Sequence, residues 1–377
     1  MILTSYAASV IPAGKKHSQL EILEALYFRD GARAVSFKAY LLDRDNSPVG
    51  EIELTGGGVD FDAFAEIKRS GTFETRYTGD ANFLANHLQP VFVLRLPGED
   101  IEFPLGIFLI ASSPPSDDGK GISLKLKGYD FTAVLLWDTL DAPLTVPEGT
   151  VITNYVSHIL TEARFTRARV VGSAAETGRD MMWEAGTSKL QVVNDLLASI
   201  NYTEVWFDRN GFAMVEPYAL PIEREVDVAY IADETSVIMP GVANEMDLFE
   251  IPNKIRVTAT NNQMPAPLVS VWENRNPRSP LSIDRVGWVR VREERVNDIT
   301  DQVTLDAYVR RLAYNAGDRF NSVPFSTPCM PLHDYYNCVY LGYPRLGLAD
   351  RFIEAGWSMD FTGGMNHKLR RQVEILV

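Results

Sequence analysis

Three side chains in the C-terminal part of the chain could bind a metal ion. Cys329, His333 and Cys338 offer two thiolates and an imidazole close together in sequence. Structural zinc sites usually contain paired ligands about two to four residues apart, with a fourth donor at similar spacing. These residues show neither feature, so we expect core or interface side chains here and no metal site. The chain has no other cysteine, and both thiols are expected to be buried and unpaired.

An oxygen-rich segment formed by Asp43, Asp45 and Ser47 is similar to the start of a calcium-binding loop. Such a loop needs a glycine at its sharp turn and a bidentate glutamate at its end. Pro48 and Leu54 stand at these two positions. We therefore predict an exposed β-turn at this segment.

Two glycine-containing segments are similar to parts of phosphate-binding loops. Residues 13–16 (AGKK) match the end of such a loop, but Ser9 replaces its first glycine and Lys16 replaces the hydroxyl residue that would hold magnesium. Residues 56–58 are three consecutive glycines without a following helix start, so we interpret them as a flexible connector between strands. Neither segment is expected to bind phosphate.

The remaining polar and aromatic residues show no catalytic motif. The histidines are dispersed and lie outside nucleophile or zinc-protease motifs: His17, His87, His158, His333 and His367. His158 is expected to be solvated, and the adjacent Asp233 and Glu234 are interpreted as turn residues and not as a glycosidase pair. Four tryptophans could line a sugar-binding groove, namely Trp206, Trp272, Trp288 and Trp357. Trp206 and Trp357 fall in strand patterns, so core or subunit contacts are favoured for them. We predict no catalytic residue, no cofactor and no metal.

The composition is that of an ordinary globular protein. The 377 residues are 46% apolar and 23% charged, which is enough for two or three domains with real cores. The 36 basic and 50 acidic residues leave a formal net charge of −14, which opposes binding to nucleic acid through a broad surface. Lys15, Lys16 and His17 follow the short N-terminal apolar run, an order that does not fit a signal peptide. No apolar run is long enough to span a membrane, so we expect synthesis in the cytoplasm.

The first part of the chain, residues 1–140, is dominated by a period of two. Apolar and polar residues alternate at 35–41 and 122–127, and further strands are expected at 52–54, 72–77, 91–96 and 101–110. Turn clusters at 43–48, 56–58 and 114–121 separate them. Short strands with such turns predict a β-barrel or sandwich. Residues 17–28 are expected to form a short entry helix.

A small α+β unit is predicted for residues 141–224. An apolar stripe predicts a helix over 152–163, and a strand is expected near 166–171. Ser188 and Gln191 form a capping-box pattern at the start of a second helix, whose apolar residues continue to Ile200. Residues 203–207 and 212–217 are expected to form a hairpin, because Asn210 and Gly211 suit its turn. This unit therefore contains two helices and a hairpin.

Strand patterns return over residues 225–377, where a second β-domain is predicted. They are clearest at 255–259, 289–291, 353–361 and 369–377. One helix is expected over 305–316, with Gly317 as its C-terminal cap. Residues 261–287 are rich in proline, asparagine and arginine and are interpreted as a long excursion loop. We therefore predict a mainly β, α+β protein, in which two β-barrel domains flank the small α+β unit.

Several short segments resemble the tail hub proteins of tailed bacteriophages and related contractile particles. Those in the middle of the chain are 186–190 (GTSKL), 194–197 (NDLL), 200–202 (INY), 206–208 (WFD), 210–211 (NG) and 216–218 (EPY). Those in the C-terminal part are 331–341 (PLHDYYNCVYL), 355–359 (AGWSM) and 363–365 (GGM). The resemblance covers about two thirds of the chain and concerns a fold and not a reaction.

The resemblance implies a structural hub of the virion tail, made in the cytoplasm of the bacterial host. Two tube-type barrels per chain would assemble as a homotrimer whose six barrels continue the sixfold tail tube. The implied partners are the tail tube or distal tail protein, the spike or tip protein and the tape-measure protein. DNA would pass through the channel without sequence-specific binding. Two alternatives remain open, a peptidoglycan-degrading tail-tip enzyme and a carbohydrate- or receptor-binding tail module.

Overall fold

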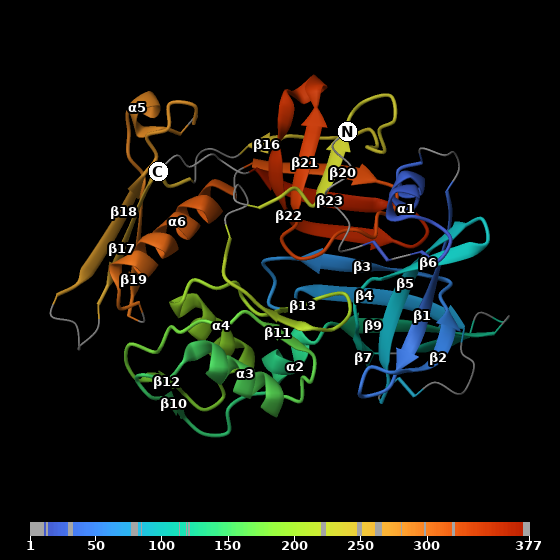
Figure 1. Ribbon diagram of the computed structural model, residues 1–377, viewed down its shortest axis with the longest axis horizontal. Helices are drawn as coiled ribbons and strands as arrows, with labels where there is room; N and C mark the ends of the chain where they lie inside the picture. The colour runs from blue at the N-terminus through green and yellow to red at the C-terminus, as the bar shows by residue number, and fades with distance from the viewer. Residues whose placement is uncertain are drawn as a thin grey trace.

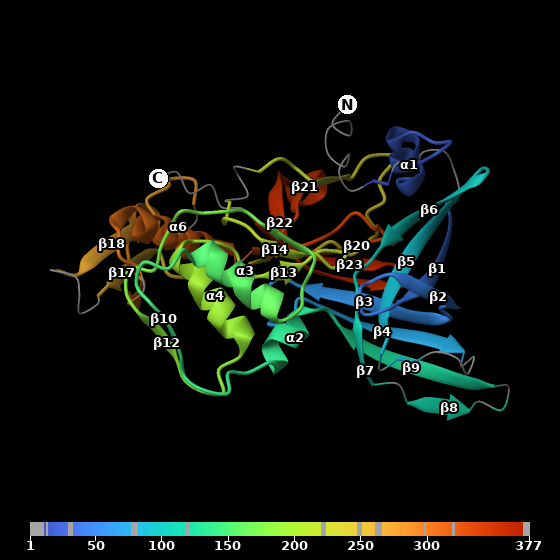
Figure 2. The ribbon, with the colours of Figure 1, turned by 60° about the horizontal axis from the view of Figure 1, so that its bottom comes forward.

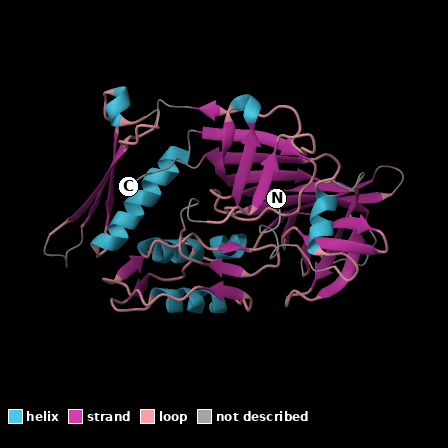
Figure 3. Cartoon of the chain, turned by 45° about the horizontal axis from the view of Figure 1, so that its top comes forward, coloured by secondary structure: helices cyan, strands magenta, loops and turns pink. Residues whose placement is uncertain are grey.

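The architecture is mainly β, and the helices lie in several separate parts of the molecule (Figure 1, Figure 3). The computed structural model describes residues 11–12, 14–28, 33–76, 82–83, 85–112, 114–117, 119, 121–219, 224–246, 251–260, 266–279, 281–297, 299–318 and 321–371. The predicted mainly β class is confirmed. In the described part of the chain the sheets are open, so two closed barrels within one chain are not confirmed.

The first β region contains two sheets. One has the order β2-β1-β5-β6, with bounds Pro48–Glu53, Ala34–Leu42, His87–Leu96 and Glu99–Pro104. The other contains β3 (Gly56–Asp62), β4 (Arg69–Arg76), β7 (Leu109–Ser112), β8 (Pro115–Asp117) and β9 (Ile122–Tyr129). Their inner faces share one core, which includes Ala39, Phe92, Phe73 and Leu126. The alternation in the sequence predicted β1, β2, β4, β5 and β9, although residue 77 lies outside the described ones. The strand expected over 101–110 is instead two strands, β6 and β7, and β3 and β8 lie in segments expected to be turns.

The entry helix α1 (Gln19–Leu26) forms as predicted and contributes to the core that the two β regions share. Ser18 accepts a hydrogen bond from the Glu21 amide while the Glu21 side chain accepts from the Ser18 amide, which satisfies two free donors at the helix start. Ile22, Leu23 and Leu26 are buried. The hydroxyl of the adjacent Tyr27 donates to the Ala229 carbonyl oxygen at 3.1 Å, so this helix fastens the start of the chain to the second β region.

The second β region continues the second sheet of the first one. Its strands are β15 (Val228–Ile231), β16 (Glu245–Met246), β20 (Asn321–Thr327), β21 (Cys338–Tyr343), β22 (Leu348–Asp360) and β23 (Met365–Arg371), with the 3-10 helix η2 (Pro344–Leu346) before β22. β22 pairs with β3 in antiparallel register, from Gly356 opposite Asp62 to Asp360 opposite Gly58. One sheet therefore runs in the order β16-β20-β23-β22-β3-β4-β9-β7. Residues 372–377 of the predicted terminal strand lie outside the described residues.

The middle unit packs below these strands in Figure 1 and holds three of the described helices (Figure 2). It contains α2 (Thr132–Trp137), α3 (Ile152–Glu162), α4 (Lys189–Ser199), β10 (Leu144–Val146), β11 (Ala168–Val170), β12 (Met181–Trp183), β13 (Trp206–Phe207) and β14 (Ala213–Val215). Ser188 caps α4 by accepting from the Gln191 amide, which is one half of the predicted capping box. β13 and β14 form the predicted hairpin, and Gly211 takes the left-handed conformation with φ 75°. Helix α2 was not predicted.

An outer subdomain, formed by β17 (Lys254–Ala259), β18 (Leu268–Glu273), α5 (Ile283–Val286), β19 (Val291–Val296) and α6 (Gln302–Asp318), stands at the left end of Figure 1. Ile255, Val257 and Leu305 belong to its own core between sheet and helix. The prediction of a loop over 261–287 is wrong at β18 and α5; residues 261–265 and 280 are not described. The predicted cap at Gly317 is also wrong, because α6 continues to Asp318.

The three predicted domains, 1–140, 141–224 and 225–377, remain a prediction. The two β regions share a sheet and one core cluster, while the middle unit and the outer subdomain have cores of their own. Among the described residues, no helix combines the length and apolar character that a membrane span requires.

Candidate functional site

A polar face covers the continuous sheet where the two β regions meet. The register aligns Ser326 of β20, Asn366 of β23, Ser358 of β22, Asp60 of β3 and Ser70 of β4 in one row across the strands. Because side chains alternate along a strand, their neighbours Phe325, His367, Trp357, Phe61 and Arg69 point into the core. The exposed face therefore carries short polar side chains, and the same row crosses from one β region to the other.

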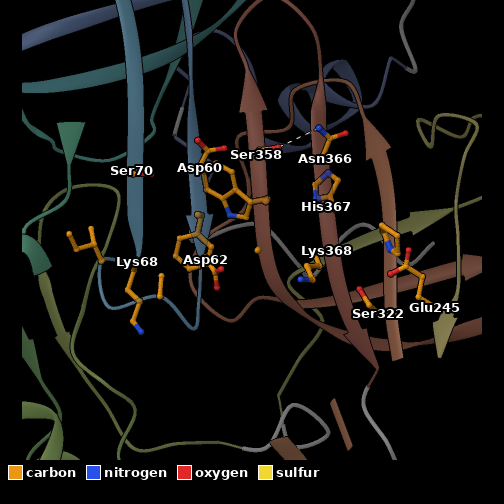
Figure 4. Close-up of a pocket in the computed structure, with 16 residues that line it drawn as sticks. Asp60, Asp62, Lys68, Ser70, Glu245, Ser322, Ser358, Asn366, His367 and Lys368 are labelled. Carbon is orange, nitrogen blue, oxygen red and sulfur yellow. Dashed lines mark hydrogen bonds between the residues drawn. The ribbon is translucent and has the colours of Figure 1, made fainter. Parts of the chain in front are cut away.

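An open pocket of about 530 Å³ lies on this polar face (Figure 4). Charged residues of both signs line it, namely Asp60, Asp62, Lys68, Glu245 and Lys368. Partial burial raises the pKa of Asp60. A binding site for a small molecule is usually a deep and mostly apolar cavity, whereas this pocket is shallow and carries charges of mixed sign.

The three-glycine run lies inside strand β3 and not in a connector, so the prediction for residues 56–58 is wrong. Gly57 has φ 118°, and a Cβ atom at this position would come within 2.1 Å of the Thr72 carbonyl oxygen. A Cβ atom at Gly58 would come within 2.5 Å of the Met359 carbonyl oxygen. Such distances are too short for any side chain, so glycine allows β3 to lie close to both β4 and β22. The run is needed where the two β regions join.

A buried ion-pair network lies beneath the junction of the three units. Each unit contributes one residue to the network. Arg69 lies on β4 of the first β region, Arg209 lies in the hairpin turn of the middle unit, and Asp334 lies in the 328–337 loop of the second β region. Arg69 Nη2 lies 2.6 Å from Asp334 Oδ1, and Arg209 Nε lies 3.4 Å from Asp334 Oδ2. Arg209 Nη1 also donates to the Pro331 carbonyl oxygen at 2.9 Å. Burial would raise the pKa of Asp334, but the two guanidinium groups outweigh it and hold the pKa below its usual value.

A second buried carboxylate, Asp130, supports the same junction, and its pKa is shifted in the opposite direction to that of Asp334. It accepts a hydrogen bond from the Arg69 amide at 3.0 Å and further bonds from Thr132. Burial raises the pKa of Asp130 to about 6, although Thr132 and Arg69 act to lower it. The folded protein therefore binds a proton at the Asp130 carboxylate more tightly than the unfolded chain does. The resulting contribution to the free energy of unfolding is complete below about pH 4 and is lost as the pH rises through about 6.

This difference predicts a specific pH dependence for Asp130→Asn. Between about pH 7.5 and pH 5, the free energy of unfolding of the natural protein should rise by about 1.4 kcal/mol relative to that of the variant. Urea unfolding of both proteins at several pH values measures the difference. Asp284→Asn is a matched control, since Asp284 is an exposed partner of Arg275, and its profile should follow the natural protein. Parallel profiles for Asp130→Asn and the natural protein would contradict the assignment.

The structure does not bring the three predicted metal-like residues together. Cys329 and Cys338 are buried thiols outside any disulfide, as predicted, and burial raises the pKa of each to about 11. The Cys329 thiol donates to the Asp360 carbonyl oxygen, whereas Cys338 packs in a separate small cluster with Val226. His333 instead contacts Glu354, a residue that the sequence analysis did not single out.

The buried triad, formed by His333, Glu354 and His367, lies behind the polar face. Its side chains are at most 1% exposed. His367 Nδ1 lies 2.6 Å from Glu354 Oε1, and His333 Nδ1 contacts Glu354 Oε2. Burial would raise the pKa of Glu354, but the two imidazoles lower it to about 2. Burial lowers the pKa of His367, although Glu354 acts to raise it.

A β-bulge explains why sequence reasoning missed Glu354. The predicted alternation placed Ile353 and Ala355 inward and therefore Glu354 outward. The register between β22 and β23 shifts between Glu354 and Gly356, so Glu354 and Ala355 are both buried. The only signal for Glu354 would have been that two buried histidines need a hydrogen-bonding partner. The sequence does not show which residues meet in the core, so this signal could not identify the carboxylate.

The other candidate residues have structural roles in the part of the chain that is described. Asp43 forms the predicted turn by accepting from the Asp45 and Ser47 amides. The Lys15 and Lys16 amides donate to the Glu99 carboxylate, at 2.6 and 2.8 Å, where a phosphate loop would bind its anion; Ser9 and Ala13 lie outside the described residues.

The predicted environments of several remaining candidates are also seen. His158 is exposed and pairs with Glu162, and Asp233 accepts hydrogen bonds from Thr235 within a turn. Trp206 and Trp357 are buried and stack on Tyr335 and Phe61. The other candidates lie apart from one another: His17 contacts the Pro97 carbonyl oxygen, His87 contacts Asn46, Trp272 is partly buried in the outer subdomain, and Trp288 is exposed.

The fold resembles solved structures of phage tail proteins. The tail protein from Neisseria meningitidis MC58 matches with a TM-score of 0.66 and 12% identity, over 89% of this chain and 97% of that one. The 43 kDa tail protein of prophage MuSo2 from Shewanella oneidensis matches with a TM-score of 0.61 and 12% identity, over the same shares of 89% and 97%. A chain of the Francisella PdpA-VgrG complex matches with a TM-score of 0.51 and 7% identity, over 90% of this chain and 58% of that one. No family model and no curated protein matches the sequence. The predicted resemblance to tail hub proteins is therefore confirmed at the level of the fold.

Proposed function

We propose that this chain, which has the fold of bacteriophage tail and baseplate proteins, is a structural hub of a phage tail or a phage-tail-like particle. The observation that carries the proposal is the pairing of β3 with β22. This pairing makes one sheet from two β regions, and each region supplies four of the eight strands along its main path. Such equal contributions are what a chain with two tube-type domains would provide.

The open edges of this sheet support a cyclic assembly. Its path ends at β16 and β7, and exposed edge strands tend to pair with another chain. Three copies joined edge to edge would supply about 24 strands. At about 4.8 Å per strand, the closed ring would be about 37 Å across between backbones. In this proposal closure of the barrel is intermolecular, and the polar face with its short side chains lines the channel.

The face proposed to line the channel suits passage without tight binding. Lys125 and Lys127 of β9 and Lys368 of β23 share it with Asp60, Asp62 and Glu74. Charges of both signs, mixed with serine and glycine, offer neither a basic groove for phosphates nor a row of base-reading side chains. The tape-measure protein would pass through this channel first and DNA second. The channel would not recognise the sequence of the DNA.

The outer surfaces are proposed to hold the neighbouring tail components. A related chain comes from the PdpA-VgrG complex, which supports assembly of the proposed hub with other proteins. The partners we propose are the tail tube or distal tail protein on one side and the spike or tip protein on the other. The virion tail, assembled in the bacterial host, is the proposed location, and no catalytic role is proposed.

The proposal predicts a threefold ring with a central pore. Light scattering should give a mass of about three times the 42.2 kDa chain, and negative-stain microscopy should show the ring. Ala111 offers a specific test, since it is exposed and the bulge in β7 leaves it outside the register with β9. Ala111→Pro removes an edge N–H and should abolish the ring, whereas Ala111→Thr should preserve it.

Several outcomes would contradict the hub. A stable monomer at high concentration opposes the proposed ring, as does a trimer that Ala111→Pro leaves intact. Clearing in a peptidoglycan zymogram would support the enzyme alternative, and strong signals on a glycan array would support the receptor-binding alternative.

A further inference from the structure

We propose that the buried triad of His333, Glu354 and His367 binds a divalent transition-metal ion, with Zn²⁺ as the best match. This inference does not depend on the proposed hub function. One candidate ligand atom from each residue lies within 4.8 Å of the other two, and all three residues are buried. Their elements are separate in sequence: the loop between β20 and β21, the bulge of β22, and β23. The fold therefore brings two nitrogen donors and a carboxylate to one point.

The orientation of the rings is that of metal ligands. Both histidines direct Nδ1 toward the two oxygens of Glu354. Both Nε2 atoms face a hydroxyl group on the other side, His333 toward Tyr230 at 2.6 Å and His367 toward Thr327 at 2.9 Å. Histidines that bind metals usually hold their second ring nitrogen in such a hydrogen bond, which fixes the ring and its tautomer.

The hydrogen-bond directions at Thr327 assign the tautomer of His367. The Thr327 hydroxyl donates to the Pro328 carbonyl oxygen at 2.9 Å. A hydroxyl group has one hydrogen, so towards His367 its oxygen accepts from Nε2–H. The Nδ1 atom of His367 then presents a lone pair to the Glu354 carboxylate. Two lone pairs 2.6 Å apart repel each other, so either a proton lies between the two atoms or they separate to admit a metal ion that binds both.

Two positive species could fill that place, a second proton on His367 or a metal ion. Geometry favours the ion, because two imidazole nitrogens and a carboxylate converge on one point inside a closed core. Two imidazole nitrogens and a carboxylate suit Zn²⁺ and similar borderline ions, whereas Ca²⁺ and Mg²⁺ prefer oxygen ligands. Both oxygens of Glu354 face the histidines, so this carboxylate can complete a set of four donors. The site is closed to solvent, which indicates a structural role.

Such an ion would strengthen the junction of the three units. His333 is next to Asp334, whose carboxylate holds Arg69 and Arg209. A metal bond from the 328–337 loop to β22 and β23 would fix this loop to the sheet. Because the unfolded chain lacks the preformed site, metal binding should appear as folding stability.

The test uses the full chain, stripped with a chelator and titrated with Zn²⁺. We expect about one ion per chain after dialysis by elemental analysis and a higher Tm with metal than without. Glu354→Gln and His367→Gln should lose the bound ion. His158→Gln is the matched control, because it removes an exposed histidine that also faces a glutamate, and it should retain full binding. Thr327→Val leaves all three ligands in place but removes the hydroxyl that holds His367 Nε2, together with its bond to Pro328, and should weaken binding by about 10- to 100-fold.

A spectroscopic measurement on the natural protein tests the site even if the variants fail to fold. Co²⁺ in place of Zn²⁺ should give the intense visible absorption of a four-coordinate site, and added Zn²⁺ should remove it. A stripped protein with the same Tm with and without Zn²⁺ would overturn the proposal, and so would a spectrum of six-coordinate Co²⁺. Equal loss of binding in His158→Gln would also overturn it. A ring that forms normally without metal would leave the hub intact, so the two proposals can fail separately.

Discussion

Replacing Asp334 with alanine should lower the free energy of unfolding by about 3–5 kcal/mol. The substitution leaves the Arg69 and Arg209 guanidinium groups buried without the carboxylate that compensates both. Removing one partner from a buried ion pair is costly because the remaining charge stays out of water. Arg69 is only 2% exposed and is held by strand β4, so it cannot turn outward to recover hydration. Urea unfolding of the natural protein and the variant measures the loss.

The control for this experiment is an ion pair of the same type on the surface. Arg256 and Glu293 lie 3.0 Å apart, and their side chains are 46% and 66% exposed. Solvent screens such pairs, so Glu293→Ala should cost less than about 1 kcal/mol. A loss from Asp334→Ala no larger than that from Glu293→Ala would show that the buried network does not hold the units together. Since the network joins three units, we also expect the unfolding transition of Asp334→Ala to become less cooperative.

Replacing Gly58 with valine should destabilise the protein by about 3 kcal/mol or more. The new Cβ atom would lie within 2.5 Å of the Met359 carbonyl oxygen, on the strand that pairs with β3. Overpacking alone usually costs about 1–3 kcal/mol, and separation of the strands also breaks hydrogen bonds of the ladder. The loss should be visible in urea unfolding and, because the same sheet forms the proposed ring, in a smaller trimer population.

Gly172→Val is the matched control, since a Cβ atom there meets nothing within 4 Å. It carries the same chemical change and should shift the free energy of unfolding by less than about 0.5 kcal/mol. If the Gly58 and Gly172 variants were equally stable, the close approach of β3 and β22 would not constrain the fold. If Gly58→Val lost stability but kept the trimer, the junction would matter for folding and not for assembly.

Much of the local structure could be predicted because its causes lie within a few residues. The predicted cap at Ser188 satisfies an amide in the next helical turn, and the Asn210-Gly211 turn depends on the left-handed conformation of Gly211. The period of two likewise marked strands such as β1 and β9. These signals also carried the resemblance to tail hub proteins, and the fold confirmed it.

The candidate site could not be predicted to the same extent, since its residues meet only through distant strand pairing. Arg209 lies in a turn that the sequence predicted correctly, yet nothing local indicates that its guanidinium group reaches Asp334. Glu354 lies in a correctly predicted strand, but a bulge set by β23 directs it inward. The sequence pattern singled out His333, but together with Cys329 and Cys338 and not with Glu354 and His367.

The sequence by itself determined the mainly β class, the capped helices, the hairpin of the middle unit and the buried state of both cysteines. Each of these follows from side-chain periodicity, backbone preference or hydrophobicity over a short span. The tertiary structure alone decided that β3 pairs with β22, that three glycines lie at this junction, and that two histidines enclose one glutamate. The residues that pair between β3 and β22 are about 300 positions apart, and the geometry of all these contacts depends on how whole sheets pack, which no local pattern encodes.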